Sequence, residues 1–244
     1  MVGSSWAVNA FDEIQLQVLQ LLGENCPSCD LSRAKLSKED LSGRNLTEAD
    51  LTQADLNGAN LSGANLTNAK LTGALLGTAN LSKANLTWAD LSGASLFWSD
   101  LTGANLSWAD LSGANLVSAD FTGADLTWAE LIAANLNWAV LTEVNMTGAD
   151  LSKATLMWAK LTGSNLTNVT LKGANLGGAN LTGADLTWAE LTGANLIGAR
   201  LGKANLEGAD LTEANLTGAN LTGENLTEAN LTETNLTGAK LEGA

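Results

Sequence analysis

Side chains that carry catalytic chemistry are scarce in this sequence. It contains no His, so a serine–histidine pair cannot be built. The only reactive-looking motif is Cys26-Pro27-Ser28-Cys29, a C-x-x-C spacing that is redox-active where it opens a helix beside a sheet. Here the favoured interpretation is a structural role at the N-terminal end. Redox sensing is an alternative, and a metal site is a weaker one because zinc would need further ligands. We therefore expect no enzyme, no cofactor and no bound metal.

Aromatic and acidic residues, in contrast, are spaced with great regularity. The seven Trp that follow Trp6 all stand at positions whose numbers end in eight, and the acids that directly precede a Leu of the repeat fall mostly at multiples of ten. Exposed Trp side chains bury a large area on binding at a low cost in entropy, and acids attract basic partners. The chemistry that this pattern predicts is recognition rather than catalysis.

The element that positions these residues is a five-residue repeat. From Leu31 to Leu241 every fifth residue is Leu, except Phe121 and Met146, and the unit reads A-[N/D]-L-[S/T]-x. A period of five fits neither an α-helix nor a flat strand. Leu and the small residue two before it point to the same side of an extended segment, and the frequent Gly at x fits a corner with positive φ. The repeat predicts a chain that advances along one short edge, turns and repeats.

The alternation of acids and Asn every ten residues implies an even number of edges per turn, and four edges give a turn of twenty residues. Every twentieth residue then forms a column on the surface. One column, which we name the tryptophan–acid strip, combines Trp88, Asp90, Trp108, Asp110, Trp128, Glu130, Trp188 and Glu190. The second tryptophan column contains Trp98, Trp138 and Trp158. The strip is interpreted either as a solvated face with a ladder of Trp rings or as a binding surface.

Strings such as ANLSGANL and ADLSGANL resemble the pentapeptide repeat family over residues 30–244. The resemblance implies an all-β solenoid, a right-handed quadrilateral parallel β-helix of about eleven coils with Leu and Ala inside. Its uninterrupted coils are similar to cyanobacterial members, most of which have no assigned activity. Some family members resemble B-DNA in width and charge and act on DNA gyrase as mimics of DNA.

The two ends of the solenoid are expected to differ. Residues 1–28 are predicted to form a capping α-helix and the loop that leads into the coil, since Phe11, Ile14, Val18 and Leu21 follow helical spacing. Residues 29–244 are predicted to form the β-helix, in one domain with the cap. The repeat continues to the last residue, so end-to-end self-association through the C-terminal coil is one expectation. Polar residues interrupt the small inward position near both ends, at Glu39, Arg44, Glu224 and Thr234.

The net charge of −14 limits the partners. No basic surface exists to neutralise phosphates, so direct binding of nucleic acid and of anionic membranes is not expected. The N-terminus has no basic segment of the kind that begins a signal peptide, and a cytoplasmic location is expected. We expect a structural or interaction scaffold that presents the tryptophan–acid strip to a protein partner; the alternative is a DNA mimic that acts on gyrase or another DNA-binding protein.

Overall fold

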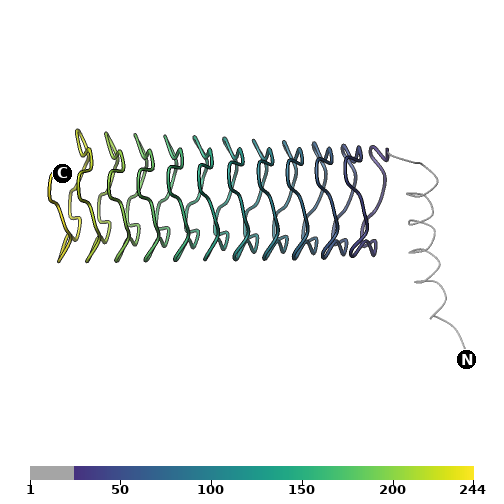
Figure 1. Cartoon of the computed structure of the whole chain (residues 1–244), viewed down its shortest axis with the longest axis horizontal. Coiled ribbons are helices and arrows are strands. Elements are labelled where there is room, and N and C mark those ends of the chain that lie inside the picture. The colour runs from purple at the N-terminus through teal and green to yellow at the C-terminus, as the bar shows by residue number, and fades with distance from the viewer. Residues whose placement is uncertain (1–24) are drawn as a thin grey trace, which may run out of the picture.

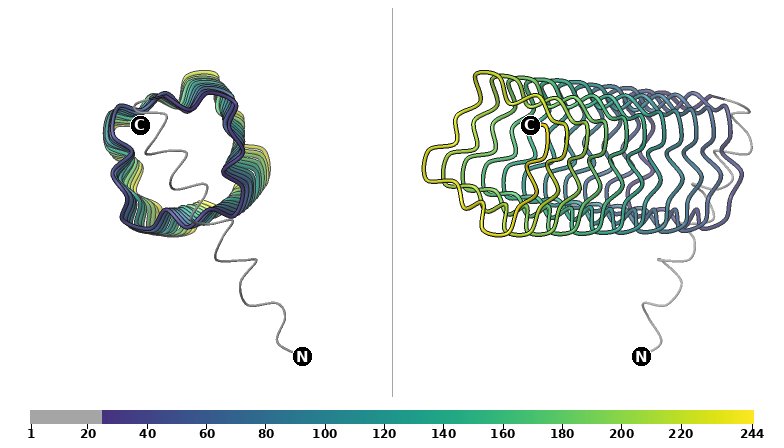
Figure 2. Two further views of the ribbon diagram at one scale, coloured as in Figure 1. Left: turned by 90° about the vertical axis from the view of Figure 1, so that its right-hand side faces the viewer. Right: turned by 60° about the vertical axis from the view of Figure 1, so that its left-hand side comes forward.

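Residues 25–244, which the computed structural model describes, form a straight rod of stacked coils (Figure 1). No helix and no extended strand occurs within these residues, and the coils are joined instead by isolated parallel β-bridges. Each bridge joins one residue to the residue twenty positions later, from Asn25–Asn45 to Asn220–Lys240. Because a bridging residue recurs every fifth position, each turn has four edges, and the view along the rod has a four-sided outline (Figure 2).

Each corner of the coil is a tight turn. At the corner that begins with Leu46, the amide N–H of Ala49 donates to the carbonyl of Leu46 at 3.0 Å, and the third residue of the turn, Glu48, has a φ of 57°. A positive φ at the third residue is the mark of a type II turn, which favours Gly. The preference of the sequence for Gly at x is explained by this turn.

Backbone hydrogen bonds hold successive coils together. Leu46 N–H donates to the carbonyl of Asn65 at 2.7 Å, and Asn65 N–H donates back to the carbonyl of Arg44 at 2.9 Å. The same pattern recurs from coil to coil along the rod. Each coil therefore depends on its neighbours in the manner of other stacked repeats.

The core is a column of Leu and small residues inside the coils, as the sequence predicts. Phe121 and Met146 take the Leu position and are fully buried. Ser99 takes the Ala position and is also buried, and its hydroxyl donates to the carbonyl of Leu96 at 2.7 Å. The core therefore accepts polar side chains that can bond to the nearby backbone.

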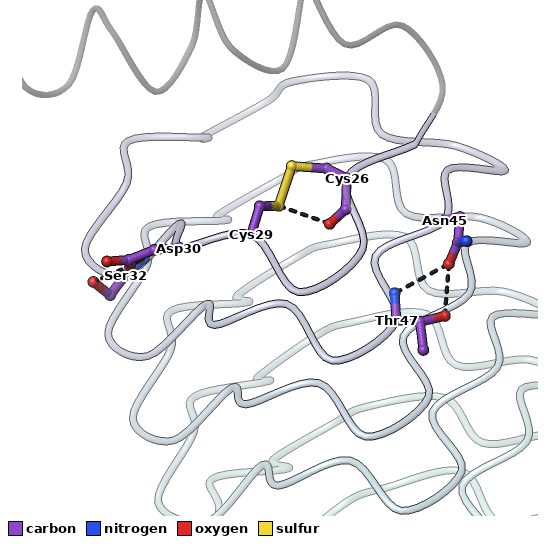
Figure 3. Close-up of a disulfide and its surroundings, with 6 residues drawn as sticks. All are labelled: Cys26, Cys29, Asp30, Ser32, Asn45 and Thr47. Atoms are coloured by element: carbon purple, nitrogen blue, oxygen red, sulfur yellow. Dashed lines mark hydrogen bonds between the residues drawn. A yellow bond between two sulfur atoms is a disulfide. The ribbon is translucent and has the colours of Figure 1, made fainter.

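The polar residue before each Leu stabilises the following corner. The side-chain Oδ1 of Asn45 accepts hydrogen bonds from the Thr47 N–H at 3.1 Å and from the Thr47 hydroxyl at 2.6 Å (Figure 3). Asn and Asp side chains commonly close such local turns. The predicted capping helix falls on residues outside the described part of the chain, and it stays a prediction.

Candidate binding surface

The Trp residues of both columns stand at corners where the backbone is left-handed. Their φ values lie between 58° and 64°, in a region that costs a non-glycine residue roughly 1–2 kcal/mol. Gly93 and Gly113 take the same corner position in neighbouring repeats without this cost. Other non-glycine residues, such as Lys38 and Glu48, take the same conformation at their corners, so the fold tolerates this cost.

Three rings of the tryptophan–acid strip form a continuous stack along the rod. The ring centroids of Trp88 and Trp108 are 5.0 Å apart with planes inclined by 8°, and those of Trp108 and Trp128 are 5.6 Å apart with an inclination of 17°. The ring of Trp128 then lies over Gly148, where a Cβ atom would overlap it. About half of each ring residue stays exposed, so the stack offers a flat aromatic surface to solvent.

Trp188 belongs to the same column but lies apart from the stack. Its ring covers Gly208, one coil further on, and again a Cβ atom there would overlap it. The strip is thus one stack of three rings followed by an isolated fourth ring.

The second tryptophan column is less regular. Trp138 and Trp158 stack at 5.7 Å with an inclination of 15°, and the Trp158 ring lies over Gly178. Trp98 is 68% exposed and stacks on no other ring in the described chain. The residue one coil after Trp98 is Ser118, whereas every other Trp of the columns is followed at that distance by Trp or Gly. A ring therefore lies flat where the next coil offers Trp or Gly.

The acids of the strip stand on one edge of the coil beside the Trp corners. Parallel bridges join Asp90 to Asp110, Asp110 to Glu130 and Glu130 to Asp150 without interruption. At neighbouring coils the spacing is about 4.8 Å, so the carboxylates form a line of like charge. The sequence correctly predicted this alignment.

Asp90 shows how these carboxylates are held. Burial alone would raise the pKa of Asp90, but hydrogen bonds from the Ser92 and Thr72 hydroxyls and from the Ser92 N–H outweigh it, and the pKa is lowered. Asp110 accepts the corresponding N–H bond from Ser112 at 2.8 Å. Asp90 is therefore ionised at neutral pH, and its hydrogen bonds hold the carboxylate in one orientation.

The charge of these acids is not needed for the fold. Asn85 Oδ1 accepts from the Thr87 N–H at 3.1 Å, which is the same bond that Asp90 Oδ1 accepts from the Ser92 N–H at 2.9 Å. An amide oxygen and a carboxylate oxygen thus close the turn alike. The preference for acids over Asn in this one column therefore reflects a property of the exposed surface and not a requirement of the turn.

Glu130 and Glu190 replace Asp in the same column. The carboxylate of Glu190 forms an ion pair with Lys172 at 2.6 Å, and its hydrogen bond and charge raise the pKa of Lys172. Both partners are about half exposed, so the pair contributes little to stability.

The C-x-x-C motif lies within the core of the N-terminal coil. Cys26 and Cys29 form a disulfide (Figure 3). Cys26 takes the position that Leu takes in later repeats and is buried, and Cys29 takes the position of Ala. Because the two sulfur atoms fill the space of a Leu–Ala pair, the geometry favours the structural interpretation.

Residues 25–244 offer no group of three or more Cys, Asp or Glu side chains placed to hold a metal ion. Across the same residues no helix has the length and apolar character needed to cross a membrane.

The side chains that sequence analysis missed are apolar and lie beside the second tryptophan column: Phe97, Met157 and Ile197. Their positions are normally filled by Ser or Thr, and that departure from the repeat was the available signal.

Comparison with known proteins identifies the family. A sequence model described as pentapeptide repeats matches overlapping segments of the chain, from residues 25–63 to residues 209–244. The chain belongs to the pentapeptide repeat family. Members of this family are known as scaffolds or interaction proteins, and solved relatives are right-handed β-helices. No curated protein matches the chain.

Several solved pentapeptide repeat structures are similar to this one. HetL from the cyanobacterium Nostoc, which is involved in regulation of heterocyst differentiation, is 34% identical, with 94% of this chain and 97% of HetL covered and a TM-score of 0.69. Rfr23 from the cyanobacterium Cyanothece is 42% identical over 39% of this chain and 58% of its own, with a TM-score of 0.18. QnrB1, a plasmid-mediated fluoroquinolone resistance protein, is 20% identical over 78% of this chain and 88% of its own, with a TM-score of 0.40.

Proposed function

We propose that this pentapeptide repeat protein is a non-enzymatic interaction scaffold that presents the tryptophan–acid strip to a basic partner protein. The observation that carries the proposal is the stack of Trp88, Trp108 and Trp128 beside a line of carboxylates. Trp side chains are enriched in binding hot spots, and a polar rim usually surrounds them. HetL, whose structure covers nearly the whole chain, is involved in regulation of heterocyst differentiation, and a role in regulation is compatible with an interaction scaffold.

The choice of residues supports recognition over a purely structural role. Gly would fit the Trp corners without a left-handed cost, and Asn would close the turns as well as Asp does. Two independent substitutions away from the neutral repeat therefore coincide on one side of the rod. A basic partner would gain both apolar contact with the rings and attraction to the acids.

The alternative function is a DNA mimic that acts on gyrase or another DNA-binding protein. The net charge of −14 and the line of carboxylates favour it. The line supplies at most one acid per coil of about 4.8 Å, whereas duplex DNA carries one charge per roughly 1.7 Å. Lys70 and Thr170 also interrupt the column. The lower charge density and the exposed rings favour the scaffold.

The test compares variants that remove rings with variants that remove charge. Trp88→Gly, Trp108→Gly and Trp128→Gly in one chain should lose the partner that wild-type protein retains from a lysate of its host. Asp90→Asn, Asp110→Asn and Glu130→Gln should weaken that binding and reduce its dependence on salt. Trp98→Gly, on the other column, is the matched control and should retain the partner.

The outcome also separates the two functions. If the charge-neutral variant relieves an inhibition of gyrase supercoiling that wild-type protein produces, the mimic replaces the scaffold. If the triple Gly variant retains the partner and only melts at a lower temperature, the ring stack is structural and the scaffold proposal is wrong.

We also propose self-association through the coil formed by residues 225–244. Leu231 and Leu241 stand at core positions of this coil, yet they are 37% and 44% exposed. The leucines of earlier coils are almost fully buried, so these two retain apolar surface that a second copy of the chain would cover.

A further inference from the structure

A long uncharged apolar surface runs along the rod on the side of the second tryptophan column. We name it the neutral stripe, and it consists of residues 75–78, 95–98, 115–118, 135–138, 155–158, 175–178 and 195–198. None of these residues is charged. The large apolar side chains that it exposes are Leu75, Phe97, Trp98, Trp138, Met157, Trp158 and Ile197.

The neutral stripe contrasts with the rest of this acidic molecule. Two copies of a chain with a net charge of −14 repel one another, and the tryptophan–acid strip would place carboxylates against carboxylates. On the neutral stripe, in contrast, two copies can approach without bringing carboxylates of one copy against carboxylates of the other. Exposed apolar surface of this extent in a charged protein marks an interaction site.

A column of charge beside the stripe fixes how two copies would meet. Parallel bridges place Asp100, Asp120, Val140, Lys160, Asn180 and Arg200 in one line, two residues after the Trp corners. Acids occupy the half of this line nearer the N-terminus, and bases occupy the other half. In two antiparallel rods related by a two-fold axis this line faces itself in reversed order, so acids of one copy can lie opposite bases of the other.

We propose that the neutral stripe is the interface of an antiparallel homodimer whose two-fold axis passes near Trp138 and Val140. In this register Asp120 of each copy lies opposite Lys160 of the other, and the arrangement occurs twice by symmetry. In the same register Val140 meets its own copy, Asp100 lies opposite Asn180 and Arg200 lies opposite Asn80, so no like charges of this line face each other. The acidic strips of the two copies remain outside the interface.

The directions of the aromatic rings fit the same register. The Phe97 ring lies over Gly77, because a Cβ atom at Gly77 would meet that ring at 2.5 Å. In this register the coil that contains Gly77 on one copy lies opposite the coil that contains Ile197 on the other. The Phe97 ring, which lies over Gly77, would therefore contact the Ile197 side chain of the other copy. The level of Trp98 lies opposite Gly178, which the Trp158 ring covers. Apolar groups therefore contact apolar groups at both ends of the stripe.

The length of the stripe sets the extent of the contact. Its seven coils are about 30 Å long at about 4.8 Å each. A specific interface buries at least about 1,000 Å² in total, so a stable dimer needs contact along the whole stripe rather than at one coil.

Sedimentation equilibrium of the full chain tests the proposal. Wild-type protein should be a dimer at tens of micromolar, and Trp98→Gly should raise the dissociation constant by at least about tenfold. The Trp98 ring stacks on no other ring in the described chain and its corner suits Gly, so this variant should fold normally. Trp188→Gly, at an equivalent corner on the other side, is the matched control and should leave the dimer intact.

Charge reversal tests the antiparallel register. Lys160→Asp should weaken the dimer, because it places a second carboxylate opposite Asp120 of the other copy, and adding Asp120→Lys should restore it. Melting curves of both variants check that the coil is retained, since Asp120 also accepts bonds from Thr122. A monomeric wild type, a dimer unaffected by Trp98→Gly or Lys160→Asp, or failure of the double reversal to restore association would overturn the proposal. Binding of the monomer to neutral phosphatidylcholine vesicles would assign the stripe to lipid instead.

Discussion

Glu224 is a residue at which the repeat and the structure disagree. It takes the inward position of Ala and is 5% exposed, and neither carboxylate oxygen makes a hydrogen bond. Burial raises the pKa of Glu224, and the nearby N–H groups of Glu224 and Lys203 offset the rise only in part. The corner bond from residue 224 to the carbonyl of Leu221, which adjacent repeats make, is also missing in the described chain.

Replacement of Glu224 by Ala should therefore stabilise the rod. We expect a gain of about 1–3 kcal/mol at neutral pH, the usual cost of a buried polar group without a partner. Because the folded pKa lies above the unfolded one, the carboxyl is tolerated below its unfolded pKa, and stability is lost as the pH rises through the folded pKa.

Thermal melts of wild type and Glu224→Ala from pH 4 to pH 8 measure this effect. The difference in melting temperature should grow with pH and nearly vanish in acid. Glu228→Ala, which changes an exposed Glu one repeat later, should show no such trend. A constant difference between Glu224→Ala and wild type would mean that volume, not charge, is responsible.

At this scale the sequence predicted where side chains point but not what they contact. Glu224 was correctly placed at an inward position, because the five-residue period alone decides inside from outside. Its missing partners and the bonds that Asp90 accepts depend on distances between atoms, which periodicity does not contain. The neutral stripe was missed because Phe97 and Ile197 depart from the repeat singly and reveal a surface only when the coils are stacked.

The element that organises the strip is the corner turn, together with the corner one coil further on. Trp128 lies flat because Gly148 leaves room for its ring, and Trp188 lies flat over Gly208 for the same reason. Sequence analysis offered a ring ladder as one interpretation, and Trp88, Trp108 and Trp128 form one. It contained no account of the Gly residues that end each stack, because ring direction depends on the volume of the neighbouring coil.

Two Gly→Ala variants separate backbone strain from ring displacement. Gly148→Ala and Gly113→Ala each introduce a Cβ at a positive φ, of 69° and 65°, which costs about 1 kcal/mol. Nothing lies within 4 Å of the Cβ at Gly113, whereas the Cβ at Gly148 overlaps the Trp128 ring. Gly148→Ala should therefore lower the melting temperature further than Gly113→Ala does.

Near-ultraviolet circular dichroism provides the second readout, because it reports the mutual orientation of the rings. Gly148→Ala should change this spectrum, and Gly113→Ala should leave it as in wild type. Equal spectra for the two variants would show that the Trp128 ring does not rest on Gly148.

At the scale of the whole molecule, residues 25–244 form a rod whose sides and end carry different kinds of surface. The alternation of acids and Asn predicted an even number of edges per turn, and the bridges confirm the predicted four edges and twenty residues. The predicted cap over residues 1–28 stays a prediction. Three surfaces, the tryptophan–acid strip, the neutral stripe and the coil 225–244, do not overlap and can be tested separately.

Self-association through the end coil should respond to Leu236→Glu, which places a charge at a core position of residues 225–244. We expect assemblies larger than a dimer to disappear from sedimentation velocity profiles of this variant. The side-by-side dimer should persist in it, whereas Trp98→Gly should remove that dimer and leave end contacts intact. A wild-type profile without species larger than the dimer would contradict association through the end.

The bridge between residues n and n + 20 also governs how such a chain tolerates insertions and deletions. Loss or gain of one pentapeptide preserves every Leu and Ala position, so the core has a period of five. The outer columns have a period of twenty, so the same event turns everything beyond it by a quarter of a revolution and joins acidic edges to neutral ones. Insertion or deletion of any multiple of five residues therefore preserves the fold. Only a multiple of twenty residues also preserves the surfaces that a partner would recognise.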